Sequence, residues 1–283
     1  MKIKIIEHLK DWRFMFKLFS FTACALILGI GLIYAFFIDY WYVDPVKDGW
    51  KIAYPRLYNI NVIMSFWSVQ TNVLVLLWFG FALFKHNQEQ KSKFTNIVSQ
   101  TNITVYITVT MFLFWGAIVG NMLGQSMYDF KNNTTSDVVV TVLTHLFTPL
   151  LMIVYYVLNI GHHRVYWRWS WTIFIYPILY CIFSYVRAEI LKADGIRPGY
   201  FIYAYPFLNF DQPLFGTSLA LSNFVTIFGL ASLMGVLCAA FSLLNNLFYK
   251  HNLKKGKLVL TTNQCQCLNC ACQHCACLSQ KRV

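Results

Sequence analysis

Six long apolar runs, separated by shorter polar segments, make up most of this 283-residue chain. Each run has roughly the 20 residues that a helix needs to cross the hydrocarbon core of a bilayer. Each is expected to be helical, because backbone groups in lipid must be hydrogen-bonded within their own segment. The predicted spans are Leu18–Phe37, Ile60–Phe84, Ile103–Gly124, Val138–Ile160, Trp169–Ala188 and Ser218–Phe248. The pattern therefore predicts an all-α membrane bundle of six transmembrane helices over residues 18–248, with a basic arm at 1–17 and a basic, cysteine-rich tail at 249–283.

The composition agrees with a membrane protein, since 58% of the residues are hydrophobic and only 12% are charged. So few polar residues do not cover the surface of a soluble globule. Lysine and arginine gather in the arm, in the second and fourth loops and in the tail, which predicts that these segments are cytosolic. We expect a multi-pass protein of the cell membrane, with both termini cytosolic and a basic face against anionic lipids. No nucleic-acid partner is expected, because the positive charge follows the membrane topology.

One histidine, His145, lies inside a predicted span, where an ionisable side chain is costly to bury and therefore indicates a function. Thr141 precedes it by one turn on the same helix face, and Pro149 follows it and is expected to loosen the helix. The second span carries a matching polar face with spacings of four, three and four residues. Its members are Asn61, Ser65, Ser68 and Asn72. At 1.5 Å per residue, Ser68 and His145 lie roughly 12 and 10 Å below the same membrane boundary, so the two faces are expected to meet.

A hydroxyl and a histidine at the same depth suit nucleophilic catalysis. The serine or threonine oxygen attacks once a neighbouring base takes its proton, and a neutral imidazole is such a base. The pattern predicts Ser68, or Thr71 beside it, as the nucleophile and His145 as the base. Because the spans hold no carboxylate to complete a triad, Thr141, Thr144, a tyrosine or a backbone carbonyl would orient the imidazole. No cofactor is expected for this reaction.

Other polar residues of the spans are candidates for substrate binding. Asn72 and Gln70 carry amide donors that suit the oxyanion of a tetrahedral intermediate. Arg187 and Tyr180 share one face of the fifth span, and the cation suits the carboxylate or phosphate head group of an amphiphile. Together with Thr141, these residues predict a lipid ester or a related amphiphilic small molecule as the substrate.

The same residues are compatible with two other functions. Serine, threonine and asparagine are common in contacts between membrane helices, which is typical of a non-catalytic structural or assembly protein. A small-molecule or lipid transporter would use the polar faces as a path, and it requires polar positions through the inner half of several spans. The third and sixth spans hold only scattered examples, namely Thr108, Ser222, Asn223 and Ser242. An intramembrane hydrolase of lipid or fatty-acyl esters is therefore preferred, and both alternatives stay open.

Four short motifs also resemble a known family. They are Phe66–Asn72, His145 with Pro149, Tyr176–Tyr180 with Arg187, and Tyr205–Asn209. Over Leu18–Phe248 the chain resembles a family of uncharacterised six-helix membrane proteins of bacteria, notably mollicutes. More remotely, it is similar to the androgen-induced membrane hydrolases, which cleave fatty-acid esters of hydroxy fatty acids with a Thr/His pair. The resemblance implies that Ser68 takes the place of the nucleophilic threonine and His145 that of the histidine; Thr71 remains a second candidate.

The tail contains a dense cysteine pattern, C-x-C-x2-C-x-C-x2-C-x-C. Its residues are Cys265, Cys267, Cys270, Cys272, Cys275 and Cys277, with His274 among them. Cytosolic thiols stay reduced, so structural disulfides are not expected. Closely spaced thiolates bind soft ions, and the pattern predicts Zn(II) or Cu(I) on the tail. Lipidation of the cysteines and a tail without function remain as alternatives.

Overall fold

The computed structural model describes residues 8–38, 49, 55–122, 135–195, 201–214 and 218–256. The elements are α2 Trp12–Ile33, η1 Tyr34–Ile38, α3 Pro55–Ser65, α4 Trp67–Phe84, η2 Glu89–Lys91, α5 Ile97–Met122, α6 Thr135–Val142, η3 Leu143–Phe147, α7 Thr148–Leu158, η4 Trp167–Phe174, α8 Ile175–Ala193, η5 Pro206–Leu208 and α9 Leu219–Lys254. The described residues contain no strand. Six helical segments are long and apolar enough to cross a membrane: Trp12–Ile38, Trp67–Phe84, Ile97–Gly120, Val138–Leu158, Trp167–Ala193 and Leu219–Lys254. The predicted all-α bundle with six spans is confirmed, and the chain is a multi-pass membrane protein.

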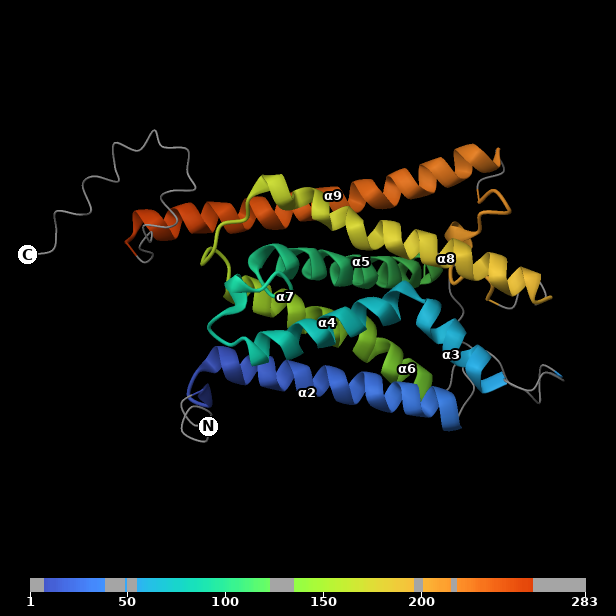
Figure 1. Cartoon of the computed structure of the whole chain (residues 1–283), viewed down its shortest axis with the longest axis horizontal. Coiled ribbons are helices and arrows are strands. Elements are labelled where there is room, and N and C mark those ends of the chain that lie inside the picture. Colours follow the sequence, from blue (N-terminus) through green and yellow to red (C-terminus); the bar gives the residue numbers. More distant parts are fainter. Residues whose placement is uncertain are drawn as a thin grey trace, which may run out of the picture.

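The six spans lie side by side, and α2 begins at the same end of the bundle at which α9 ends (Figure 1). We call this the proximal end, and the opposite end, where α3 lies, the distal end. The helix α2 packs along α4, while α4, α7 and α9 all pack against α5. The helix α5 is therefore the centre of the bundle.

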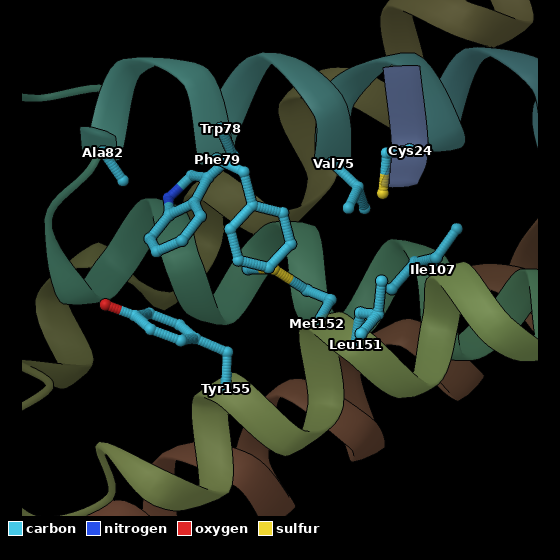
Figure 2. Packing of buried hydrophobic residues seen from close by; sticks show 9 residues of the cluster. All are labelled: Cys24, Val75, Trp78, Phe79, Ala82, Ile107, Leu151, Met152 and Tyr155. Carbon is cyan, nitrogen blue, oxygen red and sulfur yellow. The ribbon is translucent and has the colours of Figure 1, made fainter. Parts of the chain in front are cut away.

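The two largest clusters of buried side chains join the helices. The first connects α2, α4, α5 and α7 and consists of Cys24, Val75, Trp78, Phe79, Ala82, Ile107, Leu151, Met152 and Tyr155 (Figure 2). The second connects α4, α5, η4, α8, α9 and the segment 201–214, and consists of Trp67, Val105, Tyr106, Val109, Ile173, Tyr180, Leu208, Met234 and Cys238. Aromatic rings meet edge to face in both clusters. Such packing matters because lipid leaves little hydrophobic driving force between helices.

The second predicted span is not one continuous helix, so this part of the prediction is wrong. Phe66 adopts an extended backbone conformation (φ −74°, ψ 130°) and separates α3 from α4. At the distal end, α3 runs at an angle to α4 instead of continuing its direction (Figure 1). The expected polar face is therefore divided, with Asn61 and Ser65 on α3 and Ser68 and Asn72 on α4. The depth calculated for Ser68 along a continuous helix no longer applies, because Ser68 lies in the first turn of α4.

The fourth span contains a π-helical turn, η3, between α6 and α7. The Thr148 N–H donates to the Leu143 carbonyl, five residues back. Pro149 has no N–H to donate, so the His145 carbonyl lacks the partner that a regular helix would supply. The indole of Trp115 on α5 donates to that carbonyl instead, at 3.1 Å. Proline and tertiary contact together explain why the helix widens at His145.

A buried ion network fastens the proximal end. Lys17 on α2 is fully buried, and its ammonium donates to the Ala82 carbonyl at 3.0 Å, to His86 Nδ1 at 2.8 Å and to the Glu89 carboxylate. The other ring nitrogen of His86 contacts the Asp11 carboxylate at 3.1 Å. Each of the three ammonium hydrogens therefore has an acceptor, and α2 is tied to the end of α4 and to η2.

The segment between α7 and η4 is held by asparagines of α9. Asn245 accepts from the Gly161 N–H at 2.9 Å and donates to the His163 carbonyl at 2.8 Å. Gly161 has a φ of 76°, and a Cβ there would lie 2.7 Å from the Phe248 backbone. Glycine is required at this position because both the backbone conformation and the close approach exclude a side chain.

Candidate functional site

The break between α3 and α4 is stabilised by side chains from other parts of the chain. A broken helix leaves carbonyl and N–H groups without partners, which is costly in lipid. On the α3 side, the Tyr180 hydroxyl donates to the Ser65 carbonyl at 2.9 Å. The Gln70 amide donates to the Met64 carbonyl at 2.8 Å, and its oxygen accepts from the Tyr176 hydroxyl at 2.8 Å. Gln70 and Tyr180, which were predicted to bind substrate, therefore both stabilise the helix break through hydrogen bonds to its carbonyls.

Ser68 lies on the other side of the break, in the first turn of α4. Its backbone N–H donates to the hydroxyl of Tyr205 at 3.3 Å. Tyr205 comes from the segment 201–214, which folds back over the break. The Ser68 carbonyl accepts from Thr71 Oγ1 at 3.1 Å and from Asn72 Nδ2 at 2.7 Å.

The two candidate nucleophiles differ in their surroundings. Ser68 is half-buried, whereas Thr71 is fully buried. The Thr71 hydroxyl lies 3.1 Å from the Ser68 carbonyl and 2.9 Å from the Thr110 hydroxyl on α5. A hydroxyl enclosed by two partners is a poor candidate for attack on a substrate. Ser68 is the more accessible of the two.

His145 lies in the π-helical turn with one ring nitrogen engaged. Its Nδ1 lies 2.9 Å from the Thr141 carbonyl and 3.1 Å from the Thr144 hydroxyl. Because a carbonyl only accepts, the proton is assigned to Nδ1, which leaves Nε2 with a free lone pair. The ring stacks on Phe114 of α5 with centroids 4.1 Å apart. The expected orienting role of Thr141 thus falls to its backbone carbonyl.

Asn72 connects the two candidate residues. Its side-chain nitrogen donates both to the Ser68 carbonyl at 2.7 Å and to the Thr144 carbonyl at 3.1 Å. Its oxygen is buried and has no hydrogen-bond partner among the described residues. One amide therefore joins the turn of Ser68 to the turn of His145. No hydrogen bond joins Ser68 directly to His145 within the described part of the chain.

Arg187 is buried at the distal end, on α8. Its Nε donates to Asn61 on α3 at 2.7 Å, and its Nη1 donates to the carbonyls of Phe201 and Ile202 at 2.9 and 2.6 Å. Its Nη2 is buried and has no partner among the described residues. The guanidinium thus fixes the segment that carries Tyr205, and it keeps donor capacity that the described protein does not use.

Several neighbours of the site were not predicted as site residues, although Tyr205 belongs to one of the four motifs that carry the family resemblance. Tyr205 is 137 residues from Ser68 in the chain and stands in an aromatic-rich loop. Trp115, Phe114 and Thr110 come from α5, which was not expected to contribute. Burial raises the pKa of the Tyr205 phenol, so this hydroxyl keeps its proton. Only the folding of these segments onto α4 and η3 reveals the contacts.

The predicted metal site lies outside the described residues, since Cys265 to Cys277 and His274 fall in the tail. Among the described residues, no group of three histidine, cysteine or acidic side chains is arranged to hold a metal ion. Comparisons of the chain with known protein families, with curated proteins and with solved structures find no match. The site is therefore interpreted from its own geometry.

Proposed function

We propose that this protein is an intramembrane hydrolase of lipid or fatty-acyl esters, with Ser68 as nucleophile and His145 as base. The observation that carries the proposal is the double hydrogen bond of Asn72, which holds the Ser68 turn of α4 against the His145 turn of η3. A shared amide donor fixes the relative position of two turns from different spans. Such a fixed position is what a nucleophile and its base require.

The tautomer of His145 supports the role of base. With the proton on Nδ1 and donated to the Thr141 carbonyl, Nε2 is free to take the proton of a serine hydroxyl. In the first step the Ser68 oxygen bonds to the ester carbonyl carbon, its proton passes to Nε2, and the carbonyl electron pair moves to oxygen. Loss of the alcohol, which takes the proton, leaves an acyl-enzyme for water to cleave. Contacts of this type commonly tighten only when substrate is bound.

The proposal is tested with the purified full chain in detergent. Ser68→Ala and His145→Ala should each abolish turnover of 4-nitrophenyl octanoate, and an alkyl fluorophosphonate should label the parent at Ser68. The double variant should be little worse than either single one, because the two residues act as one unit. Ser232→Ala, at an exposed serine of α9, is the matched control and should behave like the parent. Parent-like turnover by both single variants would refute the hydrolase.

The break at Phe66 favours a second candidate, transport of a lipid or small molecule. Transporters use half-helices inside the membrane to present backbone groups to substrate. Here Tyr180, Gln70 and Tyr205 occupy those groups, so transport would require their release. A fluorescent lipid in liposomes discriminates between the two, because a transporter moves the intact lipid across the bilayer and a hydrolase releases its acyl chain.

The orientation belongs to the same proposal. The basic proximal end would face the cytosol of the cell and contact anionic lipids, and the site would lie in the outer half. In a variant that lacks the tail cysteines, a cysteine replacing exposed Asp194 should react with an impermeant thiol reagent in intact cells. A cysteine replacing exposed Lys91 should not react. The reverse result would invert the orientation.

A further inference from the structure

Tyr205 differs from Tyr106, Tyr176 and Tyr180 in the direction of its hydrogen bond. Tyr106 and Tyr180 donate to backbone carbonyls, and Tyr176 donates to an amide oxygen. The Tyr205 hydroxyl instead accepts from the Ser68 N–H at 3.3 Å. Among the described residues, its one side-chain partner is the Ser68 hydroxyl, and no carbonyl, carboxylate or amide oxygen accepts its own hydrogen. The Tyr205 O–H is therefore not donated to a backbone carbonyl and remains available as a donor.

The position of Tyr205 is fixed by rings and by backbone contacts. Its ring meets Phe66 edge to face at 5.5 Å and stacks on Phe207 at 4.9 Å. The Leu208 N–H donates to the Tyr205 carbonyl at 3.0 Å. Arg187 donates to the carbonyls of Phe201 and Ile202, four and three residues before Tyr205, and so holds the start of this segment. The phenol is thus preorganised beside Ser68, as an electrostatic contribution to catalysis requires.

The two amides expected to stabilise an oxyanion are already engaged. Asn72 donates to the carbonyls of Ser68 and Thr144, and Gln70 donates to the Met64 carbonyl. Moving either amide to a substrate would break these hydrogen bonds, which hold the helix break and join α4 to η3. A reaction at Ser68 therefore needs a donor from elsewhere, and Tyr205 is the neighbour that has one.

We propose that Tyr205 is a catalytic residue of the ester hydrolysis proposed above, on which this inference rests, and that its O–H donates to the carbonyl oxygen under attack. The Ser68 oxygen forms the bond to the carbonyl carbon, the serine proton goes to the base, and the carbonyl π pair becomes the oxyanion. Tyr205 donates a hydrogen bond to this oxygen and keeps its proton. When the intermediate collapses, the carbonyl re-forms and the alcohol leaves with the proton from the base.

The variant Tyr205→Phe removes the hydroxyl and keeps the ring packing. Loss of one oxyanion donor typically lowers kcat by about 10²–10³-fold, and the same fall is expected here for 4-nitrophenyl octanoate, with KM unchanged. Tyr203→Phe is the matched control, because its hydroxyl lies in the same segment and donates to Asp211 at 3.1 Å. It should retain the parent kcat.

A thiono ester, with sulfur in place of the carbonyl oxygen, separates catalysis from a purely structural role. Sulfur accepts hydrogen bonds weakly, so Tyr205→Phe should lose far less of the parent rate with the thiono ester than with the oxygen ester. An equal loss with both esters would overturn the assignment. If Tyr205→Phe does not fold, replacement of Tyr205 by 3,5-difluorotyrosine keeps the hydroxyl and makes it a stronger donor. An unchanged kcat would then overturn the assignment, and a raised kcat would support it.

The outcomes distinguish this inference from the function on which it rests. If Ser68→Ala is inactive and Tyr205→Phe keeps the parent kcat, the hydrolase stands and Tyr205 is not catalytic. If Ser68→Ala hydrolyses the ester like the parent, the proposed function fails, and the assignment of Tyr205 fails with it.

Discussion

The two ends of the bundle each bury a cation, and they treat it differently. At the proximal end, the ammonium of Lys17 has three acceptors, one of them the Glu89 carboxylate. At the distal end, Arg187 has no carboxylate among its hydrogen-bond partners in the described chain, and its Nη2 has no partner there. A cation with all its donors satisfied is suited to holding helices together. A cation with spare donors costs stability and is available to a ligand.

The same contrast holds for the histidines. His86 at the proximal end contacts a partner through each ring nitrogen, whereas His145 has a partner only for Nδ1 among the described residues. We infer that the proximal ion network of Lys17, His86, Glu89 and Asp11 is a structural clamp, and that the distal half holds the residues of the proposed function. Substitutions at the proximal end should therefore change stability, and those at the distal end should change activity.

The largest effect on stability is expected at the clamp. Glu89→Gln removes the carboxylate that contacts the buried Lys17 ammonium and should lower the free energy of unfolding by about 3–5 kcal/mol. Lys17→Met should cost less, because Glu89 is partly exposed and can be solvated. The double variant with Glu89→Gln and Lys17→Met should recover much of the stability that Glu89→Gln loses. Unfolding in mixed micelles measures these values, with exposed Lys10→Met as control; additive losses in the double variant would show that the pair is not coupled.

Arg187→Met should have a smaller effect on stability and a specific effect on substrate binding. It removes hydrogen bonds from a charged donor, each worth roughly 1.5–3 kcal/mol, but it also removes a cation that is only partly compensated. If Nη2 binds an anionic head group, KM should rise for esters with a carboxylate or phosphate and stay constant for neutral ones. Equal changes in KM for both kinds of ester would leave Arg187 as a structural anchor only.

Acid should weaken the clamp through His86. Burial lowers the pKa of His86 below its ordinary value of 6.5, and the Lys17 ammonium lowers it further. Neutral His86 therefore contributes stability that is fully present above pH 6.5 and is lost as the pH falls through 6.5 toward the folded-state pKa. Burial tends to raise the pKa of Asp11, but the hydrogen bond and charge of Arg13 outweigh it and lower the pKa below 3.8. Its contribution is lost only at lower pH.

Unfolding midpoints between about pH 8 and about pH 5 test this window. The parent should lose more stability than His86→Gln, which cannot be protonated. Desolvation by neighbouring groups also lowers the pKa of His163, so part of the loss should remain in the variant. His162→Gln, at an exposed position, should follow the parent curve. Identical pH curves for the parent and His86→Gln would show that His86 does not contribute to the stability of the clamp.

Deletion of the tail is expected to have the smallest effect, both on stability and on ester turnover. Deleting residues 257–283 should leave the unfolding midpoint and ester turnover unchanged, because the contacts described above for the clamp and for the site all join residues before 257. A peptide with Cys265 to Cys277 should bind Zn(II) or Cu(I) and release protons, since thiols must ionise to ligate. Titration under reducing conditions measures the uptake. No uptake would leave acylation or no function for these cysteines.

The sequence alone determined the fold class, the number of spans and half of the span boundaries to within two residues, because a run of about 20 apolar residues has few alternatives to a membrane helix. It also marked His145, since a single ionisable side chain in an apolar span stands out by composition. The π turn was partly foreseeable from Pro149, which lacks the N–H that a regular helix needs.

Tertiary structure alone decided how the polar groups are satisfied. Nothing local in the sequence breaks the helix at Phe66, and the break persists because Tyr180 and Tyr205 supply partners from 115 and 137 residues away. Lys17 has an acceptor for each of its hydrogens, whereas Arg187 has an Nη2 without a partner among the described residues. This difference likewise depends on which distant acceptors fold against each cation. Hydropathy is a local property that the sequence records directly, whereas the partners of a buried polar group are set by packing between helices.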